Sequence, residues 1–64
     1  MEGNAKFKQG DYCWVIKNKY TQNHSQYLFE SIVEVVAAFS FYCVVKDRYG
    51  NELHILNESL KIVD

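Results

Sequence analysis

The sequence has no proline, only three glycines and only two cysteines. Without proline or a Gly- or Ser-rich stretch, no segment has the composition of an interdomain linker. The few glycines form no Gly-rich phosphate loop. The two cysteines allow at most one disulfide, and they do not form a Cys-x-x-Cys zinc pair. We therefore expect one domain over residues 7–64, preceded by a short flexible lead at residues 1–6.

An excess of charge is also missing. Seven basic and eight acidic side chains give a net charge of −1, whereas binding to a nucleic-acid backbone usually requires a clear basic excess. Polymeric nucleic acid is therefore not an expected partner. The same balance leaves little repulsion between copies of the chain, which is compatible with self-association.

Long apolar runs are absent as well. The longest uncharged apolar stretch, 35–45, is interrupted by Ser40 and is too short to span a bilayer. No apolar run follows the charged N-terminal residues as it would in a signal peptide. The sequence therefore predicts a cytoplasmic location without membrane association, where Cys13 and Cys43 are reduced thiols packed as small hydrophobic side chains.

Residues suited to catalysis or metal binding are few and scattered. His24 and His54 lie far apart, without Cys, Asp or Glu at ligand spacing beside them. Cys13 with either histidine could imitate a nucleophile and its base, but no third group is evident that would orient the pair. We expect no enzymatic activity, no metal and no cofactor.

Residues of high β propensity dominate from Phe7 onward. Gly10 predicts a turn before the first strand, and Gly50 suits a short hairpin loop. The segment 26–38 predicts a strand because SIVEVV is β-branched, although Glu30 and Glu34 also fit one face of a helix. The expected elements are strands at 12–17, 26–38, 39–47, 52–56 and 61–64, an exposed loop at 18–25, and a helical turn at 57–60 capped by Asn57.

Two sequence motifs resemble those of SH3-like barrels, a group that includes Tudor, KOW and bacterial SH3-like domains. They are Phe7-x-x-Gly10-Asp11-x-Cys13-x-Val15, and Gly50-Asn51-Glu52-Leu53-His54-Ile55 followed by Glu58-Ser59-Leu60. The resemblance implies an all-β fold, a small five-stranded SH3-like barrel with a single helical turn before the last strand. It also implies that Cys13 and Val15 point inward and that Tyr12 and Trp14 point outward. The acidic cluster of peptide-binding SH3 domains and the basic loop of KOW domains are both missing, so the resemblance gives no biochemical role.

One Trp, five Tyr and four Phe are more rings than so small a barrel can bury. Several rings must therefore lie at the surface, where Tyr and Trp commonly anchor interfaces. The expected core consists of Phe29, Phe39 or Phe41, with Val33, Val35, Val45, Leu53, Ile55, Leu60 and Ile62.

These features support two hypotheses about function. The first is a regulatory or inhibitory binding module, of a size that suits a phage-encoded protein, which docks on a protein partner through the Tyr12 and Trp14 face or by extending a sheet edge. The alternative is a homo-oligomer that sequesters a small nucleotide signal, such as a cyclic dinucleotide, at subunit boundaries to counter host defence. A homo-oligomer is expected because a domain of this size buries only about 60% of the surface of its unfolded chain. The candidate binding residues are Tyr12, Trp14, Lys17, Tyr20, Tyr42, Lys46, Arg48 and Tyr49.

Overall fold

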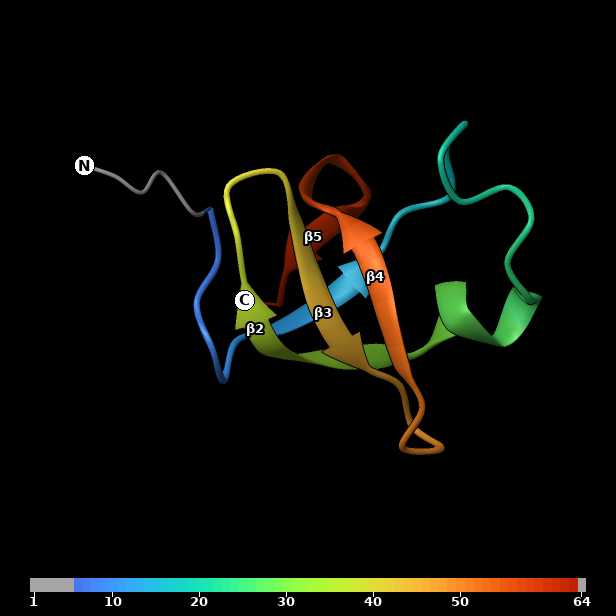
Figure 1. The fold of residues 1–64 in the computed structure, drawn as a ribbon. Coiled ribbons are helices and arrows are strands. Elements are labelled where there is room, and N and C mark those ends of the chain that lie inside the picture. Colours follow the sequence, from blue (N-terminus) through green and yellow to red (C-terminus); the bar gives the residue numbers. More distant parts are fainter. Residues whose placement is uncertain (1–5, 64) are drawn as a thin grey trace.

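A computed structural model describes residues 6–63 and contains one sheet of five antiparallel strands in the order β4-β3-β2-β1-β5 (Figure 1). The expected all-β class, with five strands and one helical turn before the last strand, is confirmed. Among residues 6–63, no helix is long and apolar enough to cross a membrane. The lead expected at residues 1–6 lies outside the described residues, apart from Lys6. The elements are β1 (Tyr12–Val15), the 3-10 helix η1 (Gln26–Glu30), β2 (Ile32–Ala38), β3 (Tyr42–Lys46), β4 (Glu52–Leu56), the 3-10 helix η2 (Asn57–Ser59) and β5 (Leu60–Ile62).

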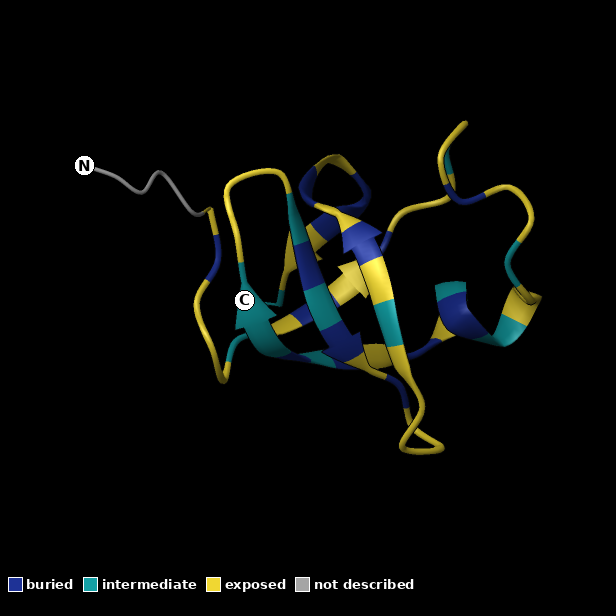
Figure 2. Cartoon of the chain, in the orientation of Figure 1, coloured by how far each residue is buried: buried dark blue, intermediate teal, exposed yellow. Residues whose placement is uncertain are grey.

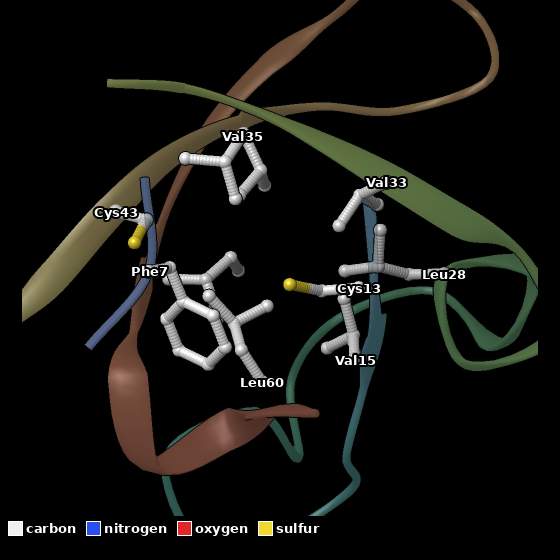
Figure 3. Close-up of a cluster of buried hydrophobic side chains, with 10 residues drawn as sticks. Phe7, Cys13, Val15, Leu28, Val33, Val35, Cys43 and Leu60 are labelled. Carbon is white, nitrogen blue, oxygen red and sulfur yellow. The ribbon is translucent and has the colours of Figure 1, made fainter. Parts of the chain in front are cut away.

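Side chains along the strands point alternately inward and outward, and the inward ones form the core. In β1, Cys13 and Val15 are buried and Tyr12 and Trp14 are exposed, so the predicted facing of this strand is confirmed. Along β4, exposed positions alternate with one intermediate and one buried position, as the yellow, teal and dark blue bands of Figure 2 show. Side chains from all five strands, from η1 and from the segment before β1 meet in one cluster (Figure 3). Its members are Phe7, Cys13, Val15, Leu28, Val33, Val35, Cys43, Val45, Ile55 and Leu60.

The strand predicted at 26–38 is wrong in its first part, where the chain forms η1 instead. The Leu28 amide donates to the Ser25 carbonyl at 3.1 Å, and the Ser31 hydroxyl donates to the Tyr27 carbonyl at 2.8 Å. This tight turn places the Leu28 side chain, which is 1% exposed, in the core. The spacing of Glu30 and Glu34 also suggests a helix. Part of that alternative is right, because residues 26–30 form a 3-10 helix.

A β-bulge explains why the predicted core is partly wrong. The β2–β3 register pairs Val35 with Val45 but Ala37 with Val44, so Val36 is an extra residue in β2. One extra residue reverses the facing of everything that follows it. Phe39 is therefore 45% exposed on the outer face rather than buried.

Two further residues of the predicted core lie at the surface. Phe41 sits at the tip of the β2–β3 hairpin, where it is 80% exposed, and β3 begins only at Tyr42 instead of at residue 39. Ile62, in the short edge strand β5, is 39% exposed. Phe29 and Leu53 are half-buried and pack against the core cluster.

Asn57 does not cap η2 as predicted. It is the first residue of that helix, and its buried side chain amide donates to the carbonyls of Phe39 at 3.3 Å and Ser40 at 3.0 Å. Its side chain oxygen accepts a bond from the Cys43 thiol at 3.2 Å. Asn57 thereby ties η2 to the β2–β3 hairpin. The turns at Gly10 and Gly50 are confirmed by φ angles of 93° and 85°.

The loop at 18–25, predicted to be exposed, is held by a buried residue. Thr21 is 2% exposed. Its hydroxyl donates to the Ile16 carbonyl at 2.8 Å and accepts from the Asn18 amide at 2.9 Å. The Asn18 side chain oxygen in turn accepts from the Ser59 hydroxyl at 2.9 Å, so the loop is fixed to η2.

Replacing Thr21 with Val should destabilise the protein by about 1–3 kcal/mol, because the part-buried Ile16 carbonyl and Asn18 amide lose their partner. Urea unfolding followed by circular dichroism measures this difference. Thr21→Ser keeps the hydroxyl and is the matched control, with a smaller loss that reflects one methyl group. Equal stability of Thr21→Val and the wild type would contradict the assigned hydrogen bonds.

Candidate functional site

Four apolar side chains lie exposed on the outer face of β1 and the start of β2. Tyr12 is 54% exposed, Trp14 and Ile16 are each 40% exposed, and Ile32 is 41% exposed. Ile16 continues the period-two alternation beyond the end of β1, and Ile32 is the cross-strand partner of Trp14. We call these four residues the β1 stripe. The sequence predicted its two aromatic members but not its two isoleucines.

The rings of the β1 stripe differ from most other rings of the molecule. Within residues 6–63, neither Tyr12 nor Trp14 stacks on another ring or lies under a cation. Most other aromatic side chains have such a partner or, like Phe7, are buried. Phe41 shares the lack of a partner, but it projects from a hairpin tip. The β1 stripe is therefore a surface on which two large rings are still available for contact.

An open groove of about 760 Å³ lies beside the stripe. Tyr12 and Ile32 form part of its wall, together with Asp11, Glu34, Lys46 and Asp47. Glu34 pairs in register with both Tyr12 and Lys46. The Asp47 carboxylate is buried and accepts a bond from Tyr27, and Lys8 Nζ lies 4.0 Å from the Asp11 carboxylate, so charges of both signs border the groove.

A second group of residues surrounds the β3–β4 turn. The Tyr27 and Tyr49 rings meet edge to face, with centroids 5.1 Å apart. The Arg48 guanidinium lies 5.6 Å from the first centroid and 5.5 Å from the second. The Tyr27 hydroxyl donates to Asp47 Oδ2 at 2.6 Å, while Asp47 Oδ1 accepts from the Tyr49 and Asn51 amides at 2.9 Å each. These contacts already occupy Arg48 and Tyr49, two of the predicted binding residues.

The hydrogen bond from the Tyr27 hydroxyl to the Asp47 carboxylate shifts the pKa values of the two groups in opposite directions. The Tyr27 hydroxyl, helped by the backbone amides of Asn51 and Tyr49, holds the pKa of Asp47 below its ordinary 3.8. The same bond to Asp47, followed by desolvation, raises the pKa of Tyr27 above its ordinary 10.0. The contact is thus strongest when the carboxyl is ionised and the phenol is protonated.

A third group is a row of stacked rings on the outer face of β3 and β4. The centroids of Phe39 and Tyr42 are 4.9 Å apart, and those of Tyr42 and His54 are 5.5 Å apart. Interplanar angles of 22° and 28° make both contacts stacked rather than edge-on. We call Phe39, Tyr42 and His54 the ring ladder. It contains the predicted residue Tyr42, and Phe39 reaches it only because of the bulge at Val36.

The eight predicted binding residues therefore do not form one site. Tyr12 and Trp14 share the β1 stripe, and Lys46 lines the groove beside it. Lys17 lies over the Phe29 ring at 5.7 Å, and Tyr20 lies under Lys19 at 5.1 Å. No local signal in the sequence places Tyr27 beside Asp47 and Arg48, because those contacts join segments that are far apart along the chain.

The thiols are poorly suited to nucleophilic chemistry. Burial, with a smaller contribution from Asp11, raises the pKa of Cys13 to about 11. Burial also raises the pKa of Cys43, whose thiol donates to Asn57. Both cysteines are free. In the part of the chain that the structure describes, no cluster of three or more His, Cys, Asp or Glu side chains could hold a metal ion.

No family model matches this sequence, and comparison with curated proteins and with solved structures found no match. The relation to SH3-like domains therefore stays a prediction.

Tyr27→Phe should lower stability at neutral pH, and the loss should depend on pH. The lowered pKa of Asp47 gives stability that is present above pH 3.8 and disappears as the pH falls through the native value. The raised pKa of Tyr27 gives stability that is present below pH 10.0 and disappears as the pH rises through its native value. The difference in Tm between variant and wild type should therefore shrink at both extremes. Tyr49→Phe is the control, and a constant difference for Tyr27→Phe would contradict the assignment.

Both thiols should react with a disulfide reagent such as DTNB only as fast as the protein unfolds, because burial keeps them protonated and covered. The release of thionitrobenzoate, followed with and without urea, measures this. Rapid labelling of folded protein at neutral pH would contradict it.

Proposed function

We propose that this protein is a non-enzymatic binding module that docks on a protein partner through the β1 stripe and so regulates or inhibits that partner. The observation that carries the proposal is the exposure of Tyr12 and Trp14, without a ring or cation partner among residues 6–63, beside Ile16 and Ile32. Binding energy in protein interfaces concentrates in central Trp and Tyr side chains that become desolvated on contact. The stripe offers such a centre.

The surroundings of the stripe suit an interface rim. Lys61 pairs in register with Trp14 on one side, and Glu34 pairs with Tyr12 on the other. Charges of both signs thus border the apolar centre, as they do in protein interfaces that are apolar inside and polar at the edge. Buried, protonated thiols support the non-enzymatic part of the proposal and suit the cytoplasmic location expected from the sequence.

The nucleotide-sequestering alternative stays a prediction. Stacking of a base on Tyr12 or Trp14 would require a nearby cation for the phosphate. Lys17 and Arg48 lie over other rings, whereas Lys61 pairs in register with Trp14 and Lys46 lines the groove beside Tyr12 together with Asp11 and Glu34. A phosphate at Lys46 would therefore also meet carboxylates, and Lys61 is the cation that this alternative would use.

The strand order and the helical turn before β5 support the resemblance to SH3-like barrels. This support concerns the architecture. The docking role rests on the surface residues alone, because a fold of this kind serves many functions.

The proposal is tested by affinity capture from the cells that make the protein, with Trp14→Ala and Phe41→Ala as paired variants. Both substitutions remove an exposed ring without a stacking partner, so they differ mainly in position. The partner should be retained by wild type and Phe41→Ala and lost by Trp14→Ala. With the purified partner, Trp14→Ala should weaken the Kd about 30-fold or more, which is the effect of a hot-spot residue.

Melting curves of both variants provide the control for folding. A partner that binds Trp14→Ala as tightly as wild type would refute docking through the stripe. A Tm rise on addition of a cyclic dinucleotide, absent in Trp14→Ala, would favour the sequestering alternative instead.

A further inference from the structure

The outer edge of β4 has unpaired backbone groups, which follows from the hydrogen bonds that flank the strand. The Asn57 amide donates to the Phe41 carbonyl, and the Asp47 amide donates to the Asn51 carbonyl, each at 2.9 Å. Both pairs continue the β3–β4 register, which runs without a shift through the whole of β4. In an antiparallel ladder, hydrogen-bonded pairs alternate with non-bonded pairs.

This alternation determines whether each backbone N–H and C=O group of β4 points toward β3 or away from the sheet. Leu53 and Ile55 direct their N–H and C=O groups toward β3, whereas Glu52, His54 and Leu56 direct theirs away from the sheet. β4 is the terminal strand of the sheet and pairs with β3 alone (Figure 1). Leu56 is the N-cap of η2, so its carbonyl accepts the first bond of that helix. Within residues 6–63, no backbone bond outside the sheet and the helices uses the other outward groups of these three residues.

The edge lacks the features that usually prevent strands from pairing. Proline and lysine are absent from β4, and its register with β3 has no bulge. Its one charged residue, Glu52, faces Lys46 within the same sheet. A regular five-residue edge with this composition is a template for another strand.

The ring ladder identifies which strand fits. The ladder crosses from the end of β2 over β3 to His54, so its last ring stands on the edge strand. Tyr42, which lies on β3, stacks on one face of the imidazole, and the other face is therefore turned away from Tyr42. A further planar group can stack there. A second copy of this chain offers such a group when its own His54 lies opposite.

We propose that two copies of this chain pair antiparallel through β4, with His54 of one copy opposite His54 of the other. In this register Leu53 lies opposite Ile55 of the second copy, so the residues that already pack in or against each core stay on the inner face. Glu52 lies opposite Leu56 of the second copy, so no like charges meet on the outer face. The two ring ladders become one continuous row across the two-fold axis.

The dimer leaves the β1 stripe free, because β2 and β3 separate β4 from β1 in the sheet. The inference therefore does not depend on the proposed docking function. Each dimer would present two β1 stripes.

Sedimentation velocity over a wide range of protein concentration tests the proposal on three proteins. The wild type should form dimers. His54→Pro removes the outward N–H in both copies without removing a β3–β4 bond, and should weaken dimerisation on the order of a hundredfold. His54→Thr keeps the N–H and removes only the ring, and should weaken dimerisation roughly threefold to tenfold.

His54→Lys keeps the backbone and places two ammonium groups opposite each other, so it carries the test if His54→Pro fails to fold. Amide hydrogen exchange gives a direct readout, because the His54 and Leu56 amides should be protected in concentrated protein and lose protection on dilution. A wild type that stays monomeric, or a dimer that folded His54→Pro and His54→Lys leave intact, would overturn the proposal. Unprotected edge amides at every concentration would overturn it as well.

Discussion

The narrow interior of this five-stranded fold decides what its surface displays. Among the described residues, the buried cluster contains Phe7 as its one ring, and otherwise valines, leucines, an isoleucine and two cysteines. A chain of 64 residues has little volume to enclose. Its remaining aromatic side chains must therefore be accommodated outside the core, although each exposes apolar area to water.

The molecule accommodates these rings in different ways, and the differences separate structural from available surfaces. Arg48 covers the rings at the β3–β4 turn, and stacking covers parts of the rings on the outer face of β3 and β4. Such contacts reduce the apolar area that a partner can reach and also fix the turns on which the rings stand. Tyr12 and Trp14 have no such cover, and for this reason the docking proposal rests on them.

The sequence predicted those features that depend on local alternation or on backbone freedom. The facing of Tyr12 to Val15, the turns at Gly10 and Gly50 and the bounds of β4 follow from period two and from positive φ angles. Features that depend on distant partners could not be read in this way. An asparagine before a helical turn looks like a cap, and only the position of the β2–β3 hairpin shows that Asn57 binds carbonyls of that hairpin instead. Of the candidate site, the two exposed rings were predictable, whereas their isoleucine neighbours and the contacts that occupy Arg48 required the fold.

The bulge at Val36 determines which side chains one whole surface displays. With the same residues and no bulge, β2 would alternate strictly, direct Phe39 inward, overfill the core and leave the ladder without its first ring. A related sequence with one residue fewer at the bulge would pair with β3 without a shift and would keep Phe39 on the outer face. For this fold, the length of β2 therefore predicts the outer surface only together with its register against β3.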